Sequence, residues 1–504
     1  MHDRTTTPWV AHIRDYLTVV GTAGGQISPS IYDTAQLLRW TPPPDPHPAR
    51  RWLLDQQQAD GGWGDPVMPR ARTVPTLAAV LALHEAGKPY LRDRIEQGCR
   101  WLFAQAPLWG DPLPQDIPVG VELVLPRLLT EARQHGLPLP YRAYTAVEAL
   151  GTRRQVLLAA QRLQAGTAPL HSWEGWGTDP DPALLDASGG MGHSPAATAV
   201  WLAQARQQGV APAAGAHAAH YLQQAGQATG SGVAGVVPTV WPIPRFEQIF
   251  ALYFLMMSGL HEHPDIAPLV QQQADDLQQA LGPEGIGMSD AFMVDGDLTT
   301  TASIVGATLG SALATPTLTR FRTNQHVFTY PGELQPSLTT TAHAAQALAA
   351  SDAGPPLQDY LLAQQDPMGI WTGDKWHASW LYTTSQVMLA LRSYAPAQPA
   401  LQRAATAIRQ AQHPTGGWGM AAPTTEETAY ALLALGITGH PTDPVLAQGA
   451  TWLTNHWSPE RVAPPRWIGK ELYVPTRLVP IIELAVLVQV TAGRTHTRTV
   501  GVPA

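Results

Sequence analysis

The sequence predicts an all-α protein built from two α/α-toroid domains, a double α-barrel. Alternating Val/Ile/Thr runs are few, whereas Ala-, Leu- and Gln-rich segments with apolar residues at helical spacing recur from end to end. Clusters of Pro and Gly separate these segments. Three similar Gln…Gly-x-Trp segments occur in both halves, which is typical of helical hairpins that stack into a closed or curved array.

Each expected helix is a run with apolar residues at helical spacing that ends near Pro or Gly. In the first half the expected helices are 8–21, 49–58, 74–87, 89–106, 119–135, 153–165, 194–208 and 214–226. In the second half they are 245–258, 264–281, 298–314, 338–351, 355–365, 378–394, 398–412, 425–437, 443–456 and 475–491. The stretch 227–244 between them is rich in Gly, Pro and Val, and is the expected domain boundary.

The three repeats are Gln57-Gln-Ala-Asp-Gly-Gly-Trp63, Gln365-Asp-Pro-Met-Gly-Ile-Trp371 and Gln412-His-Pro-Thr-Gly-Gly-Trp418. Gly permits the left-handed backbone at the end of a helix, and the Gln amide and Trp ring can tie that turn to the next helix. The repeats therefore predict architecture and say nothing directly about catalysis.

Composition excludes several classes of function. Of 504 residues only 14% are charged, 44% are hydrophobic and 17 are Trp, which predicts a large apolar interior. A formal charge of −8 and the lack of any Lys/Arg run argue against nucleic acid as a partner. The single cysteine, Cys99, excludes an internal disulfide and a cysteine-based zinc site.

The N-terminal segment is polar and has no apolar signal region, so we expect a cytoplasmic protein. The most apolar runs, 249–257 and 484–490, are much shorter than the ~20 residues of a membrane span. No membrane span is expected, and peripheral contact with a membrane stays open.

The stretch Asp295-Gly-Asp-Leu-Thr-Thr-Thr-Ala302 is the candidate for chemistry. Two carboxylates, Asp295 and Asp297, stand one residue apart and are followed by hydroxyls and an apolar helical run. From local sequence alone, a helix cap accounts for them as well as a catalytic pair does. A calcium loop fits less well, because Thr299 takes the next ligand position and no Glu follows at the loop end.

Further motifs resemble the class II diterpene cyclases, which protonate geranylgeranyl diphosphate. The Gln…Gly-x-Trp segments resemble the repeat of the wider superfamily. The more specific matches, in the family's order, are Ser30-Ile-Tyr-Asp-Thr-Ala35, Leu170-His-Ser-Trp-Glu174, Gly192-His-Ser-Pro-Ala-Ala-Thr-Ala199, Val237-Pro-Thr-Val-Trp-Pro242, Asp374-Lys-Trp-His377 and Trp467-Ile-Gly-Lys-Glu-Leu-Tyr473. The resemblance implies that 1–22 is the first helix of a C-terminal β barrel, 23–241 an inserted γ barrel, and 242–504 the β barrel with the acid motif.

By this resemblance, Asp297 is the general acid and Asp295 its partner. Burial and a neighbouring carboxylate both raise a carboxyl pKa, which keeps an acid protonated until it reacts. Thr299 is expected to orient the acidic proton by hydrogen bonding. Leu298 stands where the family has its last Asp.

Carbocations that form during cyclisation need stabilisation without a nucleophile, which aromatic faces supply. The candidates are Trp241, Phe292, Trp371, Trp376 and Tyr382, although aromatic rings near such turns are more often packing.

Lys375 and Lys470 stand in charge-poor, Trp-containing segments, and we expect them to anchor the diphosphate together with Mg²⁺, with Arg153 or Arg477 as helpers. Surface lysines with their stems on Trp are the alternative. His171 aligns with a histidine that assists the final deprotonation in related cyclases, where an Asn partners it; Thr239 occupies that Asn position. A satisfied core histidine is the alternative for His171.

The expected activity is cyclisation of geranylgeranyl diphosphate to a bicyclic diterpenyl diphosphate of labdane, halimadane or clerodane type. Asp275-Asp276-Leu-Gln-Gln lacks the third acid of a diphosphate-ionising motif, so no class I domain is expected and a separate class I synthase or phosphatase would act downstream. Farnesyl diphosphate or squalene are alternative substrates. An α/α-toroid glycosidase, whose two carboxylates would stand ~6.5–9.5 Å apart, and a non-enzymatic binding module are more distant alternatives.

Overall fold

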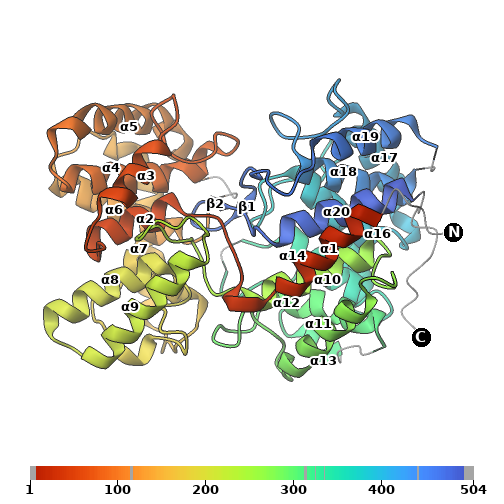
Figure 1. Cartoon of the computed structure of the whole chain (residues 1–504), viewed down its shortest axis with the longest axis horizontal. Coiled ribbons are helices and arrows are strands. Elements are labelled where there is room, and N and C mark those ends of the chain that lie inside the picture. The colour runs from red at the N-terminus through yellow and green to blue at the C-terminus, as the bar shows by residue number, and fades with distance from the viewer. Residues whose placement is uncertain are drawn as a thin grey trace.

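The computed structural model describes residues 7–113, 117–310, 315–323, 325–333, 335–439 and 442–492. They form two helical barrels side by side, as the sequence predicts, with the second barrel on the right in Figure 1. The termini of the described chain both lie in the right-hand half.

The right-hand half is a closed ring of helices with a second layer outside it. Within the described ranges, each inner helix packs on the next and the last packs on the first. The inner helices are α10 (Pro244–Met257), α12 (Gly296–Thr308), α14 (Leu338–Ala347), α16 (Trp380–Leu391), α18 (Thr425–Thr438) and α20 (Leu478–Thr491). The outer ones are α1 (Thr7–Val19), α11 (Ala267–Ala280), α13 (Thr315–Thr319), α15 (Gly354–Ala363), α17 (Gln398–Gln410) and α19 (Pro444–His456).

The left-hand half repeats this plan with a shorter inner ring. That ring consists of α2 (Ile31–Trp40), α4 (Thr73–Glu85), α6 (Val121–Gln134), the 3₁₀ segment Ala168–Gly175 and α8 (Pro195–Gln208). Outside it lie α3 (His47–Asp55), α5 (Arg92–Gln105), α7 (Thr145–Ala159) and α9 (Pro212–Gln227). Shorter 3₁₀ turns span Thr22–Gly24, Pro69–Arg72, Pro89–Leu91, Ala106–Trp109, Tyr141–Tyr144, Pro182–Leu184 and Ala395–Ala397.

The residue pattern explains which helices are inner. In α20, Leu-Val-Pro-Ile-Ile-Glu-Leu-Ala-Val-Leu-Val-Gln-Val-Thr is apolar on all sides, and residues 478–489 are all buried. A helix that is apolar all round belongs inside. In α17 the buried residues Ala400, Leu401, Ala404, Ala405 and Ile408 form one stripe, so this helix covers the ring from outside.

The repeats make the hydrogen bonds that their sequence predicts. In the second copy, Gln365 Nε2 donates to Gly369 O and Ala400 O, both at 2.8 Å, and Trp371 Nε1 donates to Leu361 O at 2.7 Å. Each copy thus joins the end of one outer helix to its own turn and to the start of a following outer helix. The first and third copies, at Gln57–Trp63 and Gln412–Trp418, make the same set of bonds.

The chain passes between the halves near its start. Helix α1 packs against α20 and α11 in the right-hand half, after which the chain crosses to build α2–α9 and returns at α10 (Figure 1). The short hairpin β1 (Trp467–Ile468) and β2 (Leu472–Tyr473) lies between the halves, and Val119 N donates to Gly469 O at 3.0 Å across them. The boundaries after 22 and 241 stay a prediction.

Several elements differ from the predictions. Helices α2 and α13 and the β1–β2 hairpin were not expected; α2 begins at a cap in which Ser30 Oγ accepts the Asp33 N–H at 2.9 Å. Helix α7 spans Thr145–Ala159 rather than 153–165. Its Gly151 looks like a breaker in the sequence, yet a Cβ there would lie 2.2 Å from Glu122 O, so the glycine allows α7 to approach α6.

Helix α12 ends at Thr308, and residues 311–314 of the expected helix lie outside the described ranges. Among the described helices, none has the length and apolar character needed to cross a bilayer.

Candidate active site

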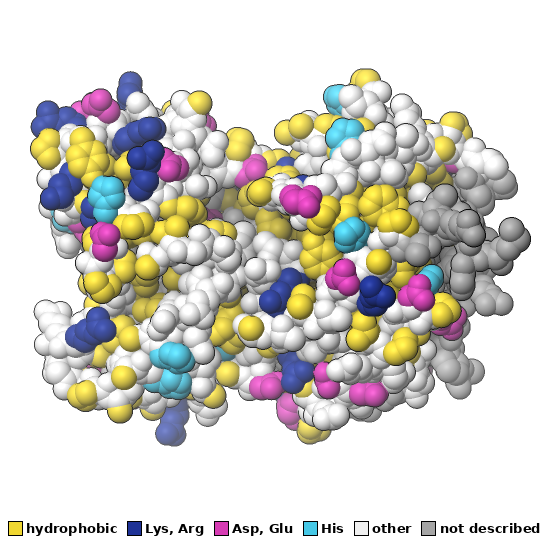
Figure 2. All heavy atoms as spheres, in the orientation of Figure 1, with side chains coloured by type: hydrophobic (Ala, Val, Ile, Leu, Met, Phe, Trp, Pro, Cys, Tyr) yellow, Lys and Arg dark blue, Asp and Glu magenta, His cyan; other side chains and the backbone are white. Residues whose placement is uncertain are grey.

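Two adjoining cavities open where the halves meet. The inner one, which we call the acid chamber, has a volume of about 70 Å³ and is lined by Asp295, Asp297 and Leu298 together with aromatic residues of the right-hand half. The other, the outer chamber, has a volume of about 190 Å³ and is lined by residues of both halves. Figure 2 shows a hollow between the halves with hydrophobic side chains along it. The two chambers share Val240, Met288, Tyr330, Trp376 and Tyr473.

The two carboxylates lie at the start of α12, inside the ring of the right-hand barrel. Asp295 caps the helix, because its Oδ1 accepts the Leu298 N–H at 2.7 Å. Asp297 stands in the first turn and lines the acid chamber. The helix-cap interpretation therefore applies to Asp295, whereas Asp297 remains the candidate acid.

Asp297 is paired with a histidine. Its Oδ1 lies 2.6 Å from Nδ1 of His343, which stands on α14 and is fully buried. One proton must lie between these atoms, because two bare lone pairs would repel at that distance. On the far side of the ring, His343 Nε2 lies 3.2 Å from Gln386 Oε1, which also accepts from Tyr253 OH at 3.0 Å.

Asp295 is 1% exposed, and its surroundings disfavour the charged form. Burial raises the pKa of Asp295 well above its usual range, and the nearby charges of Asp297 and Glu333 raise it further. The Leu298 N–H opposes these influences. The acid motif therefore contains a carboxyl group that favours its protonated form.

Thr299 does not orient the acid. Its Oγ1 accepts the Ile286 N–H at 3.0 Å and donates to Ile286 O at 3.3 Å, so it holds the loop before the motif. Leu298, in the position of the family's last Asp, lines the acid chamber and adds an apolar wall there.

Three of the five predicted aromatic residues line a chamber. Phe292 lines the outer chamber, Tyr382 the acid chamber, and Trp376 both. Trp371 does not, because it is fully buried and its Nε1 serves the repeat. Trp241 packs in the core of the left-hand half instead. Sequence analysis missed the chamber residues Phe246, Phe250, Tyr330, Trp467 and Tyr473.

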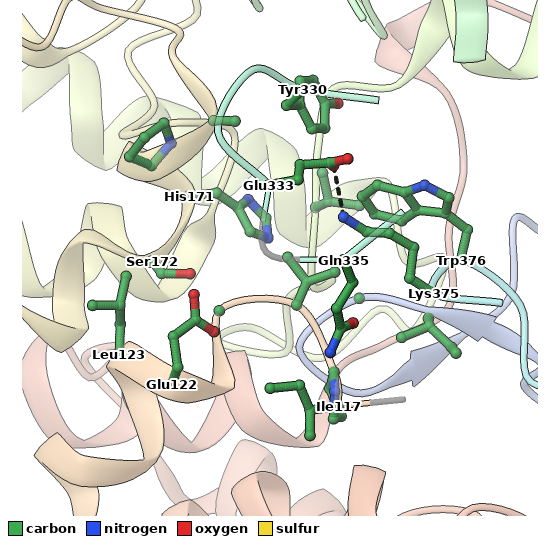
Figure 3. A pocket seen from close by; sticks show the side chains of 18 of the residues that line it. Ile117, Glu122, Leu123, His171, Ser172, Tyr330, Glu333, Gln335, Lys375 and Trp376 are labelled. Carbon is green, nitrogen blue, oxygen red and sulfur yellow. Dashed lines mark hydrogen bonds and ion pairs between the residues drawn. The ribbon is translucent and has the colours of Figure 1, made fainter. Parts of the chain in front are cut away.

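The two predicted lysines lie in different places. Lys375 lines the outer chamber, where its Nζ lies 2.6 Å from Glu333 Oε1 (Figure 3). Lys470 is 1% exposed and lines neither chamber; its Nζ contacts Glu174 Oε1 at 2.5 Å and Ser194 Oγ at 2.6 Å. Because the Lys470 Nζ is bonded to Glu174 and Ser194 inside the core, its position favours a structural role, and its role in anchoring the diphosphate stays a prediction.

A second cation in the outer chamber is Arg154, rather than the predicted Arg153 or Arg477. Its Nη1 donates to Gly332 O at 2.9 Å, and its Nε is 3.9 Å from Glu122 Oε1. Arg477 lies at the surface end of α1, where its Nη1 donates to Val19 O.

His171 lines the outer chamber opposite Lys375 (Figure 3). Its Nδ1 lies 3.0 Å from Gly192 O. A carbonyl only accepts hydrogen bonds, so Nδ1 carries the proton and Nε2 is bare. Burial, followed by the charge of Lys470, holds the pKa of His171 well below its usual range. Thr239, in the position of the family's Asn, is buried, and within the described ranges its Oγ1 has no hydrogen-bond partner.

The prediction that a magnesium ion takes part is wrong. Among the residues that the structure describes, no three His, Cys, Asp or Glu side chains come together to hold a metal ion. The carboxylates of the outer chamber face cations of the chain instead, Glu333 with Lys375 and Glu122 with Arg154.

Comparison with known proteins points to one family. A model described as "squalene-hopene cyclase C-terminal domain" matches residues 341–462. The chain is 42% identical to a (+)-kolavenyl diphosphate synthase of Herpetosiphon aurantiacus, over 95% of this chain and 97% of that protein. It is 31% identical to a labda-7,13-dienyl diphosphate synthase of Streptomyces clavuligerus, over 92% and 89%.

A solved structure agrees over the whole length. The ent-copalyl diphosphate synthase from Streptomyces platensis superposes with a TM-score of 0.79 at 29% identity, and the match covers 96% of this chain and 100% of that one. Full-length relatives with one kind of activity, together with an aspartic acid at the head of an aromatic chamber, show that the chain belongs to the class II diterpene cyclases, enzymes that start cyclisation by protonation.

Proposed function

We propose that the protein protonates geranylgeranyl diphosphate and cyclises it to a bicyclic diterpenyl diphosphate of labdane, halimadane or clerodane type. The relatives named above are diterpenyl diphosphate synthases, which supports this substrate class. The observation that carries the proposal is the Asp297–His343 pair at 2.6 Å, placed in a chamber with aromatic walls. Family membership leaves the glycosidase and binding-module alternatives without support.

Asp297 supplies the proton. An alkene is a very weak base, so the acid must be neutral before reaction and must sit where water is scarce. His343 holds Oδ1, which leaves the second oxygen of Asp297 to present its proton to the terminal double bond. As the carboxylate forms, the hydrogen bond to His343 strengthens and stabilises it. That gain appears only as charge develops, which is what lowers a barrier.

The chamber walls stabilise the carbocations that follow. Trp376, Tyr382 and Phe250 present π faces or edges and no strong nucleophile. Each desolvated ring that a cation faces contributes ~2 kcal/mol. Because the walls are apolar, including Leu298, water is kept from capturing the cation early.

The diphosphate stays in the outer chamber throughout. Lys375 and Arg154 supply the cations. The compact ammonium of Lys375 and the planar, forked guanidinium of Arg154 both suit phosphate oxygens. Lys375 is bonded to Glu333 and Arg154 faces Glu122 at 3.9 Å in this structure, so binding exchanges these carboxylates for phosphate oxygens.

His171 is the terminating base. Its bare Nε2 takes the proton from the final cation, and its lowered pKa keeps the ring neutral and ready to accept. The product keeps its diphosphate, and a class I synthase or a phosphatase consumes it in the next step. A cytoplasmic location and the division of the chain at 22/23 and 241/242 are part of the same proposal.

The substrate is tested by incubating the purified protein with geranylgeranyl diphosphate, farnesyl diphosphate or squalene, then treating with phosphatase and analysing by mass spectrometry. We expect a bicyclic C20 alcohol from geranylgeranyl diphosphate only. Linear alcohols alone would refute the cyclase activity, and turnover of another substrate would change the assigned chain length.

The acid is tested by Asp297→Asn. The amide is nearly isosteric and cannot donate an acidic proton, so turnover should fall by about 10³-fold or more while the protein stays folded. The matched control is Asp276→Asn on the surface of α11, which should leave turnover unchanged. Retained turnover in Asp297→Asn would move the proton donor elsewhere.

A further inference from the structure

Glu333 makes two hydrogen bonds with its two carboxylate oxygens. Its side chain is 7% exposed, and Oε1 lies 2.6 Å from Lys375 Nζ (Figure 3). The other oxygen, Oε2, accepts the backbone N–H of Thr329 at 3.0 Å. One buried carboxylate therefore connects a cation of the outer chamber to the backbone of a loop that lines the acid chamber.

That loop is hydrogen bonded to the first turn of α12, which carries Asp295 and Asp297 and which we call the acid turn. Thr329 O accepts the backbone N–H of Gly296 at 2.9 Å, and Gly296 stands between the two carboxylates of the motif. Gly296 packs tightly against the backbone of Phe328, because a Cβ on Gly296 would lie 2.2 Å from Phe328 O. A shift of Thr329 would therefore be passed to the turn that carries Asp297.

The side chain of Thr329 is held as well. Its Oγ1 accepts the Trp376 Nε1–H at 2.8 Å and lies 2.9 Å from Thr340 Oγ1. Trp376 follows Lys375 in the chain, and the Lys375 Nζ lies 4.6 Å from its ring centroid. Anchor, aromatic wall and acid turn thus meet at Thr329.

We propose that Glu333 is a positioning residue that couples the diphosphate anchor to the acid turn, a role that rests on the proposed function. In the free enzyme it neutralises Lys375. When a diphosphate pairs with Lys375, Glu333 Oε2 continues to hold Thr329 and, through Thr329 O, the turn of Asp297. The acid is then held in register with a substrate whose other end is anchored in the outer chamber.

The charge at this position supports the coupling. Burial raises the pKa of Glu333, and the charge of Lys375 is the largest influence that opposes it. Glu333 is also among the groups that raise the pKa of Asp295, so its carboxylate lies within electrostatic reach of the acid turn. If Glu333 were only a counterion for Lys375, it would need the contact with Lys375 Nζ but not the hydrogen bond from the Thr329 N–H.

The test separates the effect of the Glu333 charge from the effect of its hydrogen bond to the Thr329 N–H. Glu333→Gln retains an oxygen that can accept the Thr329 N–H but loses the charge, whereas Glu333→Ala loses both. Both substitutions free Lys375, so KM for geranylgeranyl diphosphate should fall or stay unchanged in each. The kcat should stay within about twofold of the parent for Glu333→Gln and fall by about tenfold or more for Glu333→Ala. The matched control is Glu284→Ala, an exposed glutamate of the same barrel, with unchanged kcat.

Equal loss of kcat in the two variants, or no loss in either, would overturn the positioning role. If Glu333→Ala does not fold, Glu333→Asp decides: it keeps the charge but is one methylene too short to reach both partners, so kcat should fall by about fivefold. Unchanged kcat in Glu333→Asp would overturn the proposal. Failure of the proposed function gives a different result, because the parent protein itself would then yield only linear alcohols from geranylgeranyl diphosphate.

Discussion

Asp295 and Asp297 stand one residue apart in one helical turn, yet their surroundings give them separate tasks. Asp295 accepts a hydrogen bond that caps the helix, and Asp297 contacts His343 and lines the acid chamber. A side chain's neighbours, more than its identity, decide which carboxyl group reacts.

Asp295 should make stability depend on pH. Its folded-state pKa lies well above the usual 3.8, so its contribution is fully present below that value and is lost as pH rises through the folded pKa. Asp295→Asn keeps the cap acceptor and does not titrate. The free energy of unfolding of Asp295→Asn relative to the parent should therefore increase as pH rises from about 4 to 8.

Denaturant unfolding at both pH values measures this difference. Asp276→Asn, the same substitution at an exposed position on α11, serves as the matched control. A constant or shrinking advantage of Asp295→Asn would contradict the raised pKa.

At this scale the sequence predicted the acid turn but not its partner. The motif order and local pattern were enough to select Asp295, Asp297, Lys375 and His171, which line the two chambers. His343 is a single histidine in a helical run of mostly Thr and Ala, 46 positions from Asp297. Only closure of the barrel brings it to the acid, and a polar residue at an apolar, inward-facing position was the one available signal.

Lys375 and Lys470 looked alike in sequence, because each stands beside Trp in a charge-poor segment. The two lysines differ in burial. Lys470 is paired with Glu174 inside the core, whereas Lys375 lines the outer chamber. Partners from distant parts of the chain carry no local signal.

The recurring Gln…Gly-x-Trp turns hold the helices of both barrels, and their periodicity was sufficient to predict the fold. Most helices appear near their expected places because their ends coincide with Pro and Gly. Helix α7 was misplaced because Gly151 serves close packing instead of ending a helix.

A comparison of two tryptophans tests the difference between a turn residue and a wall residue. Trp371→Phe removes the bond to Leu361 O and should cost ~1–3 kcal/mol of stability with kcat nearly unchanged. Trp376→Phe removes the bond to Thr329 and alters the chamber wall, so kcat or the product profile should change.

Thermal unfolding and product analysis of both variants provide the measurement. If Trp371→Phe changed the product profile, the placement of that ring outside the chambers would be contradicted.

Between the two barrels, Lys470 forms a buried ion pair with Glu174 of the left-hand half. Removing one partner leaves an unpaired charge in the core, so Lys470→Met should destabilise the protein by ~3–5 kcal/mol. Changing both partners, Lys470→Met with Glu174→Gln, should recover part of this loss, because the unpaired charge is gone.

Equilibrium unfolding measures both variants, with Lys375→Met as the matched control. The control should raise KM for geranylgeranyl diphosphate and destabilise the protein less than Lys470→Met does, because Lys375 and its partner Glu333 border a chamber. A Lys470→Met protein as stable as the parent, with a raised KM, would return Lys470 to the anchor.

The path of α1 bears on the order in which the protein is made and folded. Helix α1 leaves the ribosome before the other helices of both barrels, yet its partner α20 emerges after them. The left-hand barrel has all its helices once α9 has emerged, so it can fold during synthesis. The right-hand barrel must wait for α20, and until then the apolar face of α1 needs temporary cover. Synthesis therefore imposes a sequence of events in which the barrel that carries the acid is the last to close.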